Sequence, residues 1–274
     1  MSQNRDLEHS VHVQFEVESF GECPNDDPTR WSVMLSAYLD ECGQESKGLV
    51  IVAGFIGDNH SWGKCALAWR EGFNGSQRKT LHLSDLKFKR QSEKKLLECL
   101  GPIPEQCGLK RISGSVNVAD YYDMVERTVA ELHAHGYSLS LVPLVLAIRD
   151  AIPEDECYEL IFEEQTALGF YRDKLLTFLS YILANDPAVK SGTKKNQLIS
   201  WKAMTKGQTR LFEPADYLCY HLSHNSREPG SIRTNWTKPI MGSGAIGTRH
   251  LTREACREIF SIAPSVVSRY LGPF

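Results

Sequence analysis

The sequence predicts an α/β protein with a mixed sheet flanked by helices. Two strand-like segments come first, at residues 33–41 and 49–57, and helix-like and strand-like segments alternate after them. This alternation is typical of α/β domains rather than of helical bundles or β-sandwiches. The chain has 274 residues, 42% of them hydrophobic, which is enough for one large domain or two small ones with a buried core.

Composition excludes several classes of protein. Charged residues make up 24% of the chain, far from the low hydrophobicity and high charge of disordered proteins. The longest nearly apolar run, 137–148, is shorter than the ~20 residues of a membrane span and is interrupted by Ser138, Ser140 and Pro143. The first residues lack the apolar stretch of a secretory signal. We therefore expect a cytoplasmic protein without a membrane partner.

Cysteine spacing and net charge narrow the function further. The eight cysteines contain no CxxC pair, so neither a zinc ribbon nor a thioredoxin-like motif is expected, and the thiols are interpreted as reduced. The net charge of −3 gives no overall basic signal. A nucleic-acid partner would therefore have to be recognised by a local basic patch.

The first half of the chain alternates strands and helices. The strands at 33–41 and 49–57 are joined by a turn-rich segment and predict a long β-hairpin. Ser61 is the expected N-cap of the next helix. The remaining elements are predicted as a helix at 62–73, a short strand or loop at 80–86, a helix at 91–100 and a strand at 109–118.

The second half continues the pattern. Gly136 is expected to end a helix over 120–136, whereas the apolar run 137–148 fits either a strand or a helix. Pro214 stands at the favoured first turn of a further helix. The other elements are predicted as strands at 157–165 and 197–204 and helices at 170–185, 215–224 and 252–262.

The chain is expected to divide into three parts. Residues 1–30 are polar and rich in turn residues, and form an N-terminal appendage. Residues 31–224 hold the alternating elements and form the main domain. Residues 225–274 begin with a stretch rich in Gly, Ser and Pro and form a C-terminal extension.

Acidic residues stand at the ends of several predicted elements. Asp40 closes the first strand, where alternation places it on one face and Glu41 on the other. Glu163 and Glu164 follow an apolar strand, and only one of them can face a given side. Asp216 lies in the first turn of a helix, where the helix dipole favours its charge.

These acids would repel one another if the strand ends converge. Mg²⁺ or Mn²⁺ relieves such repulsion, and two ions about 3.5–4 Å apart could clamp the attacking and leaving oxygens of a phosphodiester. The alternative is that the acids are ordinary solvated or helix-capping residues.

Several short motifs in one order resemble a known family, the mostly bacterial domain of unknown function 3800. Its opening strand is similar to the segment from Tyr38 to Gly43, Tyr-Leu-Asp-Glu-Cys-Gly. The further motifs are the apolar strand VIVAGFI, a helix with tryptophans, the His-x-Ser-Asp step at 82–85, the strand IFEEQ, and Leu-x-x-x-Ala-Asp at 211–216. The matches span about residues 36–222.

The resemblance implies a ribonuclease H-like fold, in which acids on the first strand, a later strand and the final helix hold divalent metal ions. It implies Asp40, Glu163 and Asp216 as metal ligands. The second choices are Glu41, Asp85 and Glu164. The chain departs from the family pattern at Cys42, where serine is usual, and at the middle acid, where Asp is commoner than Glu.

Basic residues concentrate in two stretches. Segment 78–95 holds seven Lys or Arg against two acids, and 190–210 holds six against none. Both stretches could flank the acidic site as a phosphate-binding rim, or could be solvated surfaces without a partner. The expected phosphate contacts are Lys87, Lys89, Lys202 and Lys206.

Three histidines are candidates for chemistry. His82 could position water or a phosphate and shuttle a proton, or could make a structural hydrogen bond. His221 and His224 have a spacing that suggests zinc, but no cysteine or acid pair completes a tetrahedral set. The leading hypothesis is a nuclease dependent on Mg²⁺ or Mn²⁺. The alternatives are a non-catalytic module that binds nucleic acid or protein, and a zinc protein.

Overall fold

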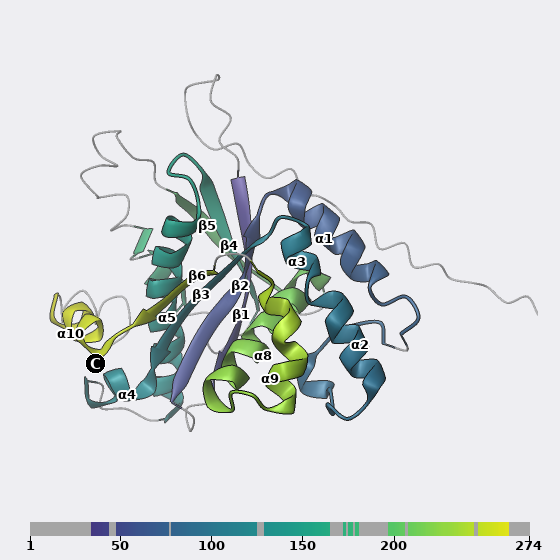
Figure 1. The fold of residues 1–274 in the computed structure, drawn as a ribbon. Coiled ribbons are helices and arrows are strands. Elements are labelled where there is room, and N and C mark those ends of the chain that lie inside the picture. Colours follow the sequence, from purple (N-terminus) through teal and green to yellow (C-terminus); the bar gives the residue numbers. More distant parts are fainter. Residues whose placement is uncertain are drawn as a thin grey trace, which may run out of the picture. The chain divides into compact units, whose positions relative to one another are not determined.

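A computed structural model gives the fold (Figure 1). It describes residues 34–43, 48–76, 78–124, 129–164, 172–173, 175–177, 179–180, 197–205, 208–243 and 246–262. Residues 1–33, expected to hold the N-terminal appendage and the start of the first strand, lie outside the described residues.

One mixed sheet of six strands, in the order β5-β4-β1-β2-β3-β6, organises the domain. Strand β2 runs antiparallel to both of its neighbours, β1 and β3. Strand β4 runs parallel to β1, β5 parallel to β4, and β6 parallel to β3. The strands are β1 (Met34–Gly43), β2 (Leu49–Gly57), β3 (Lys110–Asn117), β4 (Cys157–Glu163), β5 (Leu198–Met204) and β6 (Ile246–Leu251).

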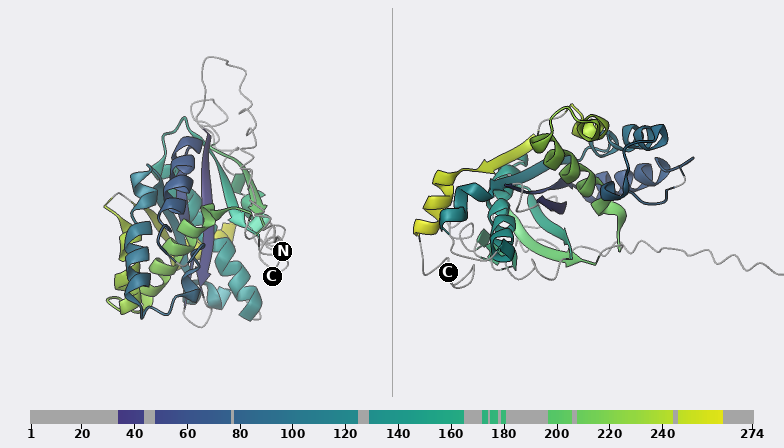
Figure 2. Two further views of the ribbon diagram at one scale, coloured as in Figure 1. Left: turned by 90° about the vertical axis from the view of Figure 1, so that its right-hand side faces the viewer. Right: turned by 90° about the horizontal axis from the view of Figure 1, so that it is seen from below.

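Helices cover both faces of the sheet, so the predicted α/β class with a mixed sheet flanked by helices is confirmed (Figure 2). The α-helices are α1 (Asn59–Glu71), α2 (Gln91–Leu100), α3 (Ile103–Gln106), α4 (Val118–Tyr121), α5 (Val129–Ala151), α8 (Glu213–Arg227), α9 (Ile232–Thr237) and α10 (Arg253–Ile262). The 3₁₀ helices are η2 (Leu83–Asp85), η3 (Tyr122–Met124), η4 (Arg210–Phe212) and η5 (Lys238–Met241). None of these helices combines the length and the apolarity needed to cross a membrane.

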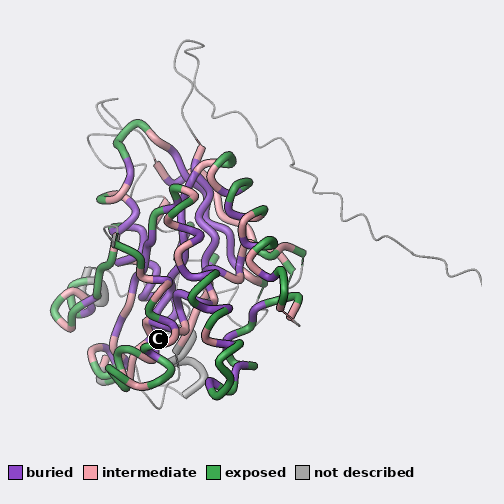
Figure 3. The backbone as a smooth tube through the Cα atoms, turned by 45° about the vertical axis from the view of Figure 1, so that its right-hand side comes forward, coloured by how far each residue is buried: buried purple, intermediate pink, exposed green. Residues whose placement is uncertain are grey.

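Two hydrophobic cores lie on opposite faces of the sheet. Along β1 the side chains alternate: Leu35, Ala37 and Leu39 belong to the core under α5, whereas Tyr38 belongs to the core that α1, α2 and α8 close. Most residues of the central strands are buried, as Figure 3 shows in purple. The two faces therefore have separate surroundings, which decides where each acidic side chain can point.

The predicted N-cap of α1 is wrong by three residues. Asp58, not Ser61, caps this helix, and its Oδ1 accepts the backbone N–H of Ser61 at 2.7 Å. An aspartate cap also places a negative charge at the positive end of the helix dipole, which a serine cap does not.

The expected helix end at Gly136 is also wrong. Helix α5 passes through Gly136 and Pro143, and it includes all of 137–148, the run that fitted either a strand or a helix. A Cβ built on Gly136 would lie 2.4 Å from the Tyr121 hydroxyl and 2.9 Å from Val50 Cγ2. This glycine therefore serves close packing inside a helix rather than helix termination.

The other predicted elements mostly hold. The strands at 109–118, 157–165 and 197–204 and the helices at 91–100, 215–224 and 252–262 are confirmed within one or two residues at most of their ends. The segment 80–86, expected as a short strand or loop, is irregular apart from η2 at 83–85. Of the helix expected at 170–185, the described residues 172–173, 175–177 and 179–180 are helical.

The segment after residue 224 takes part in the main sheet. Strand β6 pairs with β3 from Arg111 opposite Ile246 to Val116 opposite Leu251. Helix α9 packs against α8 and α2. The boundary expected at residue 224 therefore does not separate the C-terminal segment from the sheet.

Candidate functional site

Two of the expected metal ligands stand side by side on neighbouring parallel strands. In β1 and β4 the last paired residues are Leu39 and Phe162, and the next residues along the two strands are Asp40 and Glu163. Because side chains alternate, both acids lie on the face of the sheet that α8 covers. The alternation thereby selects Glu163 over Glu164.

Helix α8 brings the third acid to this face. Cys219 Sγ donates to the Asp40 carbonyl oxygen at 3.0 Å, which fixes α8 against β1. Asp216 lies one turn earlier, in the first turn of α8, next to the buried Pro214 and Ala215. Its Oδ2 accepts the backbone N–H of Leu83 at 3.1 Å and lies 3.1 Å from His82 Nδ1. The two contacts attach the start of η2 to α8.

The charges of the acids act on one another. The pKa of Asp40 is raised well above its ordinary value, first by burial and then by the negative charges of Asp216 and Glu41. The backbone N–H of Glu41 opposes this rise, and the charge of Glu163 adds to it. Glu163 and Asp216, which are far from Asp40 in the sequence, thus lie within electrostatic reach of it.

Two of the three second-choice acids, Glu41 and Glu164, point away from Asp40. Glu41 lies on the opposite face, where its charge, after burial, raises the pKa of Tyr137 in α5. Glu164 is exposed and accepts the Thr205 hydroxyl at 2.9 Å. Asp85 is exposed, and its carbonyl oxygen accepts a hydrogen bond from Arg78 at 3.3 Å. Glu41 and Glu164 therefore do not join Asp40 on the α8 face.

A hard divalent cation fits this donor set by chemistry. Carboxylate oxygens are the ligands that Mg²⁺ and Mn²⁺ prefer, and a cation would offset the repulsion that raises the pKa of Asp40. As the side chains stand, however, no three His, Cys, Asp or Glu residues in the described part of the chain are arranged to hold a metal ion.

The two histidines of α8 are engaged in structural hydrogen bonds. His221 Nδ1 lies 2.9 Å from the Thr237 hydroxyl, and His224 Nδ1 lies 3.0 Å from the Tyr220 carbonyl oxygen. Burial lowers the pKa of His221 to about 4. The first contact connects α8 to α9, and the second lies within α8. Among the residues with described positions, the two histidines belong to no group of three possible metal ligands.

The expected phosphate-binding lysines have different surroundings. Lys87 and Lys89 are exposed on the segment between η2 and α2. Lys202, on β5, forms a 3.4 Å ion pair with the buried Glu159 of β4. Lys206 lies outside the described residues.

Two further acids near the site, the buried Glu159 and the half-buried Glu213, were not predicted from the sequence. Glu159 accepts the Ser36 hydroxyl at 3.0 Å, and it shares the α8 face with Glu163 because the two are four residues apart on one strand. The alternation of side chains along β4 could therefore have predicted that Glu159 faces the same side as Glu163. Glu213 accepts the Trp69 indole N–H at 2.8 Å and the Leu81 backbone N–H at 3.1 Å. No local pattern marks Glu213, because its partners lie more than a hundred residues earlier.

Comparison of the chain with protein-family models, with curated proteins and with solved structures finds no match. The resemblance to domain of unknown function 3800 therefore stays a prediction, and the function has to be argued from the site itself.

Proposed function

We propose that the protein is a nuclease of ribonuclease H-like architecture that hydrolyses phosphodiester bonds with a divalent metal ion. The observation that supports this most is the convergence of Asp40, Glu163 and Asp216 on one face of the sheet, where burial and then neighbouring negative charge raise the pKa of Asp40. The acids stand on the first strand, a later strand and a late helix, the placement that the family resemblance implies.

In this proposal Asp40, Glu163 and Asp216 hold Mg²⁺ or Mn²⁺. The bound ion would act as a Lewis acid and lower the pKa of the attacking water. His82 is held through Nδ1 by Asp216 and is about half exposed, so its Nε2 remains to exchange a proton with solvent or substrate. Glu213 positions His82 indirectly, since it fixes the backbone of the preceding residue, Leu81.

A cleavage assay tests this function. Labelled single-stranded RNA, single-stranded DNA, both duplexes and the RNA–DNA hybrid are incubated with Mg²⁺, Mn²⁺ or EDTA. We expect cleavage only with a divalent ion. Asp40→Asn should lower the rate by about 100-fold or more, the equivalent of the several kcal/mol that a metal ion contributes to transition-state stabilisation.

The matched control for this assay is Asp155→Asn, which makes the same change at an exposed acid before β4. It should cleave like the wild type. Equal rates for the wild type and Asp40→Asn would refute the assignment of the site.

The second candidate is a non-catalytic module that binds nucleic acid or protein. It is favoured by the absence, among the described side chains, of a ready set of three metal ligands. It predicts no cleavage and no binding of divalent ions, whereas its affinity for nucleic acid would survive substitution of Asp40.

A further inference from the structure

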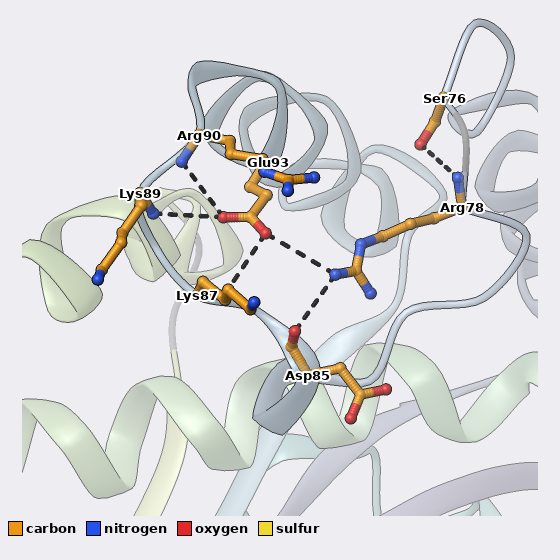
Figure 4. A network of polar contacts seen from close by, with 7 residues as sticks. All are labelled: Ser76, Arg78, Asp85, Lys87, Lys89, Arg90 and Glu93. Atoms are coloured by element: carbon orange, nitrogen blue, oxygen red, sulfur yellow. Dashed lines mark hydrogen bonds and ion pairs between the residues drawn. The ribbon is translucent and has the colours of Figure 1, made fainter.

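Glu93 is a buried carboxylate that organises the segment before α2. Its side chain is 7% exposed. One oxygen accepts the backbone N–H groups of Lys89 at 3.3 Å and Arg90 at 3.4 Å, and the other accepts that of Lys87 at 3.4 Å (Figure 4). Arg78 adds an ion pair at 3.7 Å. The main chain of 87–90 therefore folds around a single anion.

Arg78 closes this arrangement from the other side. One nitrogen of its guanidinium contacts Glu93 and also donates to the Asp85 carbonyl oxygen at 3.3 Å (Figure 4). Burial alone would raise the pKa of Glu93, but the N–H donors of Arg90, Lys89 and Lys87 and the charge of Arg78 hold it below its ordinary value. Glu93 is consequently ionised at neutral pH.

The inward main chain leaves the basic side chains outside. Lys87, Lys89 and Arg90 are all exposed, and Lys89 extends away from the Glu93 carboxylate in Figure 4. Phe88, between the two lysines, is buried and has a φ of 52°, in the left-handed region that side chains other than glycine rarely adopt. This backbone conformation lets the Phe88 ring point into the core while the neighbouring lysines stay exposed.

Phe88 anchors this segment to the helix that bears Asp216. Its ring stacks on Tyr220 of α8 with the centroids 5.6 Å apart, and it lies 6.1 Å from the ring of Trp236 in α9. Tyr220 is one turn after Asp216 on α8. At the other end of residues 82–90, His82 and Leu83 contact the Asp216 carboxylate. The basic side chains are thus held at a fixed place relative to the candidate site.

The anion-binding backbone at the start of α2 is already occupied by Glu93. A phosphate from a partner would therefore meet the side chains of the segment and not the N–H groups of the helix start. Of the two acids in 78–95, Glu93 is buried against Arg78, so the exposed charge of the segment is strongly positive. A polymer with regularly spaced anions matches such a row of cations.

We propose that Glu93 is a positioning residue for nucleic acid. By holding the main chain of 87–90 inward, it presents Lys87, Lys89 and Arg90 as a preformed contact for a phosphodiester backbone that leads to Asp216. The inference rests on the proposed function only for the choice of nucleic acid as partner, and binding without cleavage would leave it intact.

A binding experiment tests the basic surface. Fluorescence anisotropy is measured on the full chain in EDTA, with labelled single- and double-stranded DNA and RNA of about 20 nucleotides, at several salt concentrations. The triple variant Lys87→Ala/Lys89→Ala/Arg90→Ala should bind more weakly. Its plot of log affinity against log salt should be less steep by about 2 to 3, close to one unit for each lost phosphate contact.

The control is Lys64→Ala/Arg70→Ala/Arg257→Ala, which removes the same charge from exposed positions on α1 and α10. It should keep the wild-type slope. Equal slopes for the two triple variants, or no binding of any nucleic acid by the wild type, would overturn the proposal. So would binding of vesicles that contain phosphatidylserine by a protein that binds no nucleic acid.

Substitution of Glu93 gives a test with opposite signs. If charge alone matters, Glu93→Ala removes an anion beside the basic surface and should tighten binding. If Glu93 positions the segment, Glu93→Ala should weaken binding, and Glu93→Gln, which keeps an acceptor oxygen, should restore part of it. Tighter binding by Glu93→Ala would overturn the positioning role.

Circular dichroism and thermal unfolding of the Glu93 variants exclude global unfolding as the cause of a loss. The exposed triple variant leaves the packing intact, and so it tests the surface even if Glu93→Ala does not fold. Cleavage measured separately with Mg²⁺ distinguishes the two proposals. Cleavage with an unchanged salt slope in the triple variant refutes this inference alone, and binding without cleavage refutes the nuclease alone.

Discussion

At the residue scale, the ionisation of Asp40 is the property of the candidate site that can be tested most directly. Its carboxyl group is buried and lies near the negative charges of Asp216 and Glu41. Its pKa is raised because these surroundings make the ionised form unfavourable. Neutral Asp40 is favoured by the folded chain. The favourable contribution is complete below the unfolded pKa near 3.8 and is lost as the pH rises through the folded value.

A substitution that removes the ionisation should therefore stabilise the protein. In EDTA, Asp40→Asn should unfold at a higher temperature than the wild type at pH 7 to 8, and this advantage should shrink toward pH 4. Thermal unfolding at a series of pH values measures it. Asp155→Asn should show no such trend, and a wild type that is more stable than Asp40→Asn at pH 8 in EDTA would contradict the raised pKa.

At the level of single residues, the sequence located the acids better than their partners. Strand alternation predicted that Asp40 and Glu41 face opposite sides, and it limited the choice at Glu163 and Glu164 to one acid. It did not predict the contacts that hold Asp216, because Leu83 and His82 lie 133 and 134 residues away from it. Such pairings come from tertiary packing and leave no local pattern.

At the scale of elements, helix α5 shows how packing overrides a local signal. A glycine after an amphipathic stretch usually marks a helix end, and a proline usually breaks a helix. Here both Gly136 and Pro143 lie inside α5, whose described part from 136 to 148 is almost wholly buried against the sheet. The glycine is explained by Val50 of β2 and by Tyr121, which lie outside α5 and are brought against it by tertiary packing.

Two glycine substitutions separate helix propensity from close packing. Alanine is favoured over glycine inside a helix by about 1 kcal/mol. Gly136→Ala should nevertheless destabilise the protein by about 1–3 kcal/mol, because its Cβ would overlap the Tyr121 hydroxyl and Val50. Gly63→Ala, at an exposed position of α1 with nothing within 4 Å, should stabilise it by about 0.5–1 kcal/mol. Urea unfolding measures both, and a stabilising Gly136→Ala would refute the close approach.

At the scale of the whole molecule, the two faces of the sheet differ in the acidic side chains that they carry. The face under α5 carries an apolar core and Glu41, whereas the face under α8 adds Asp40, Glu163, Asp216 and the buried Glu159 to its own apolar core. The alternation of helices and strands predicted this layered class. The place of β6 beside β3 was not predicted, because a parallel pair with more than a hundred residues between its strands has no signature in either strand alone.

The position of the basic segment also belongs to this scale. The sequence showed that 78–95 is rich in lysine and arginine, but the charges alone could not distinguish a solvated surface from an oriented one. The fold supplies the difference, since Glu93 and Phe88 fix the segment beside α8. Neither contact follows from composition.

Calorimetric titration of Mn²⁺ and Mg²⁺ into the metal-free protein is the most direct test of the idea that three separated acids form one cation pocket. We expect saturable binding to the wild type and to Asp155→Asn, and a loss of affinity of at least about tenfold in Asp40→Asn and in Asp216→Asn. A wild type that takes up neither ion, or variants that bind as tightly as the wild type, would contradict the account.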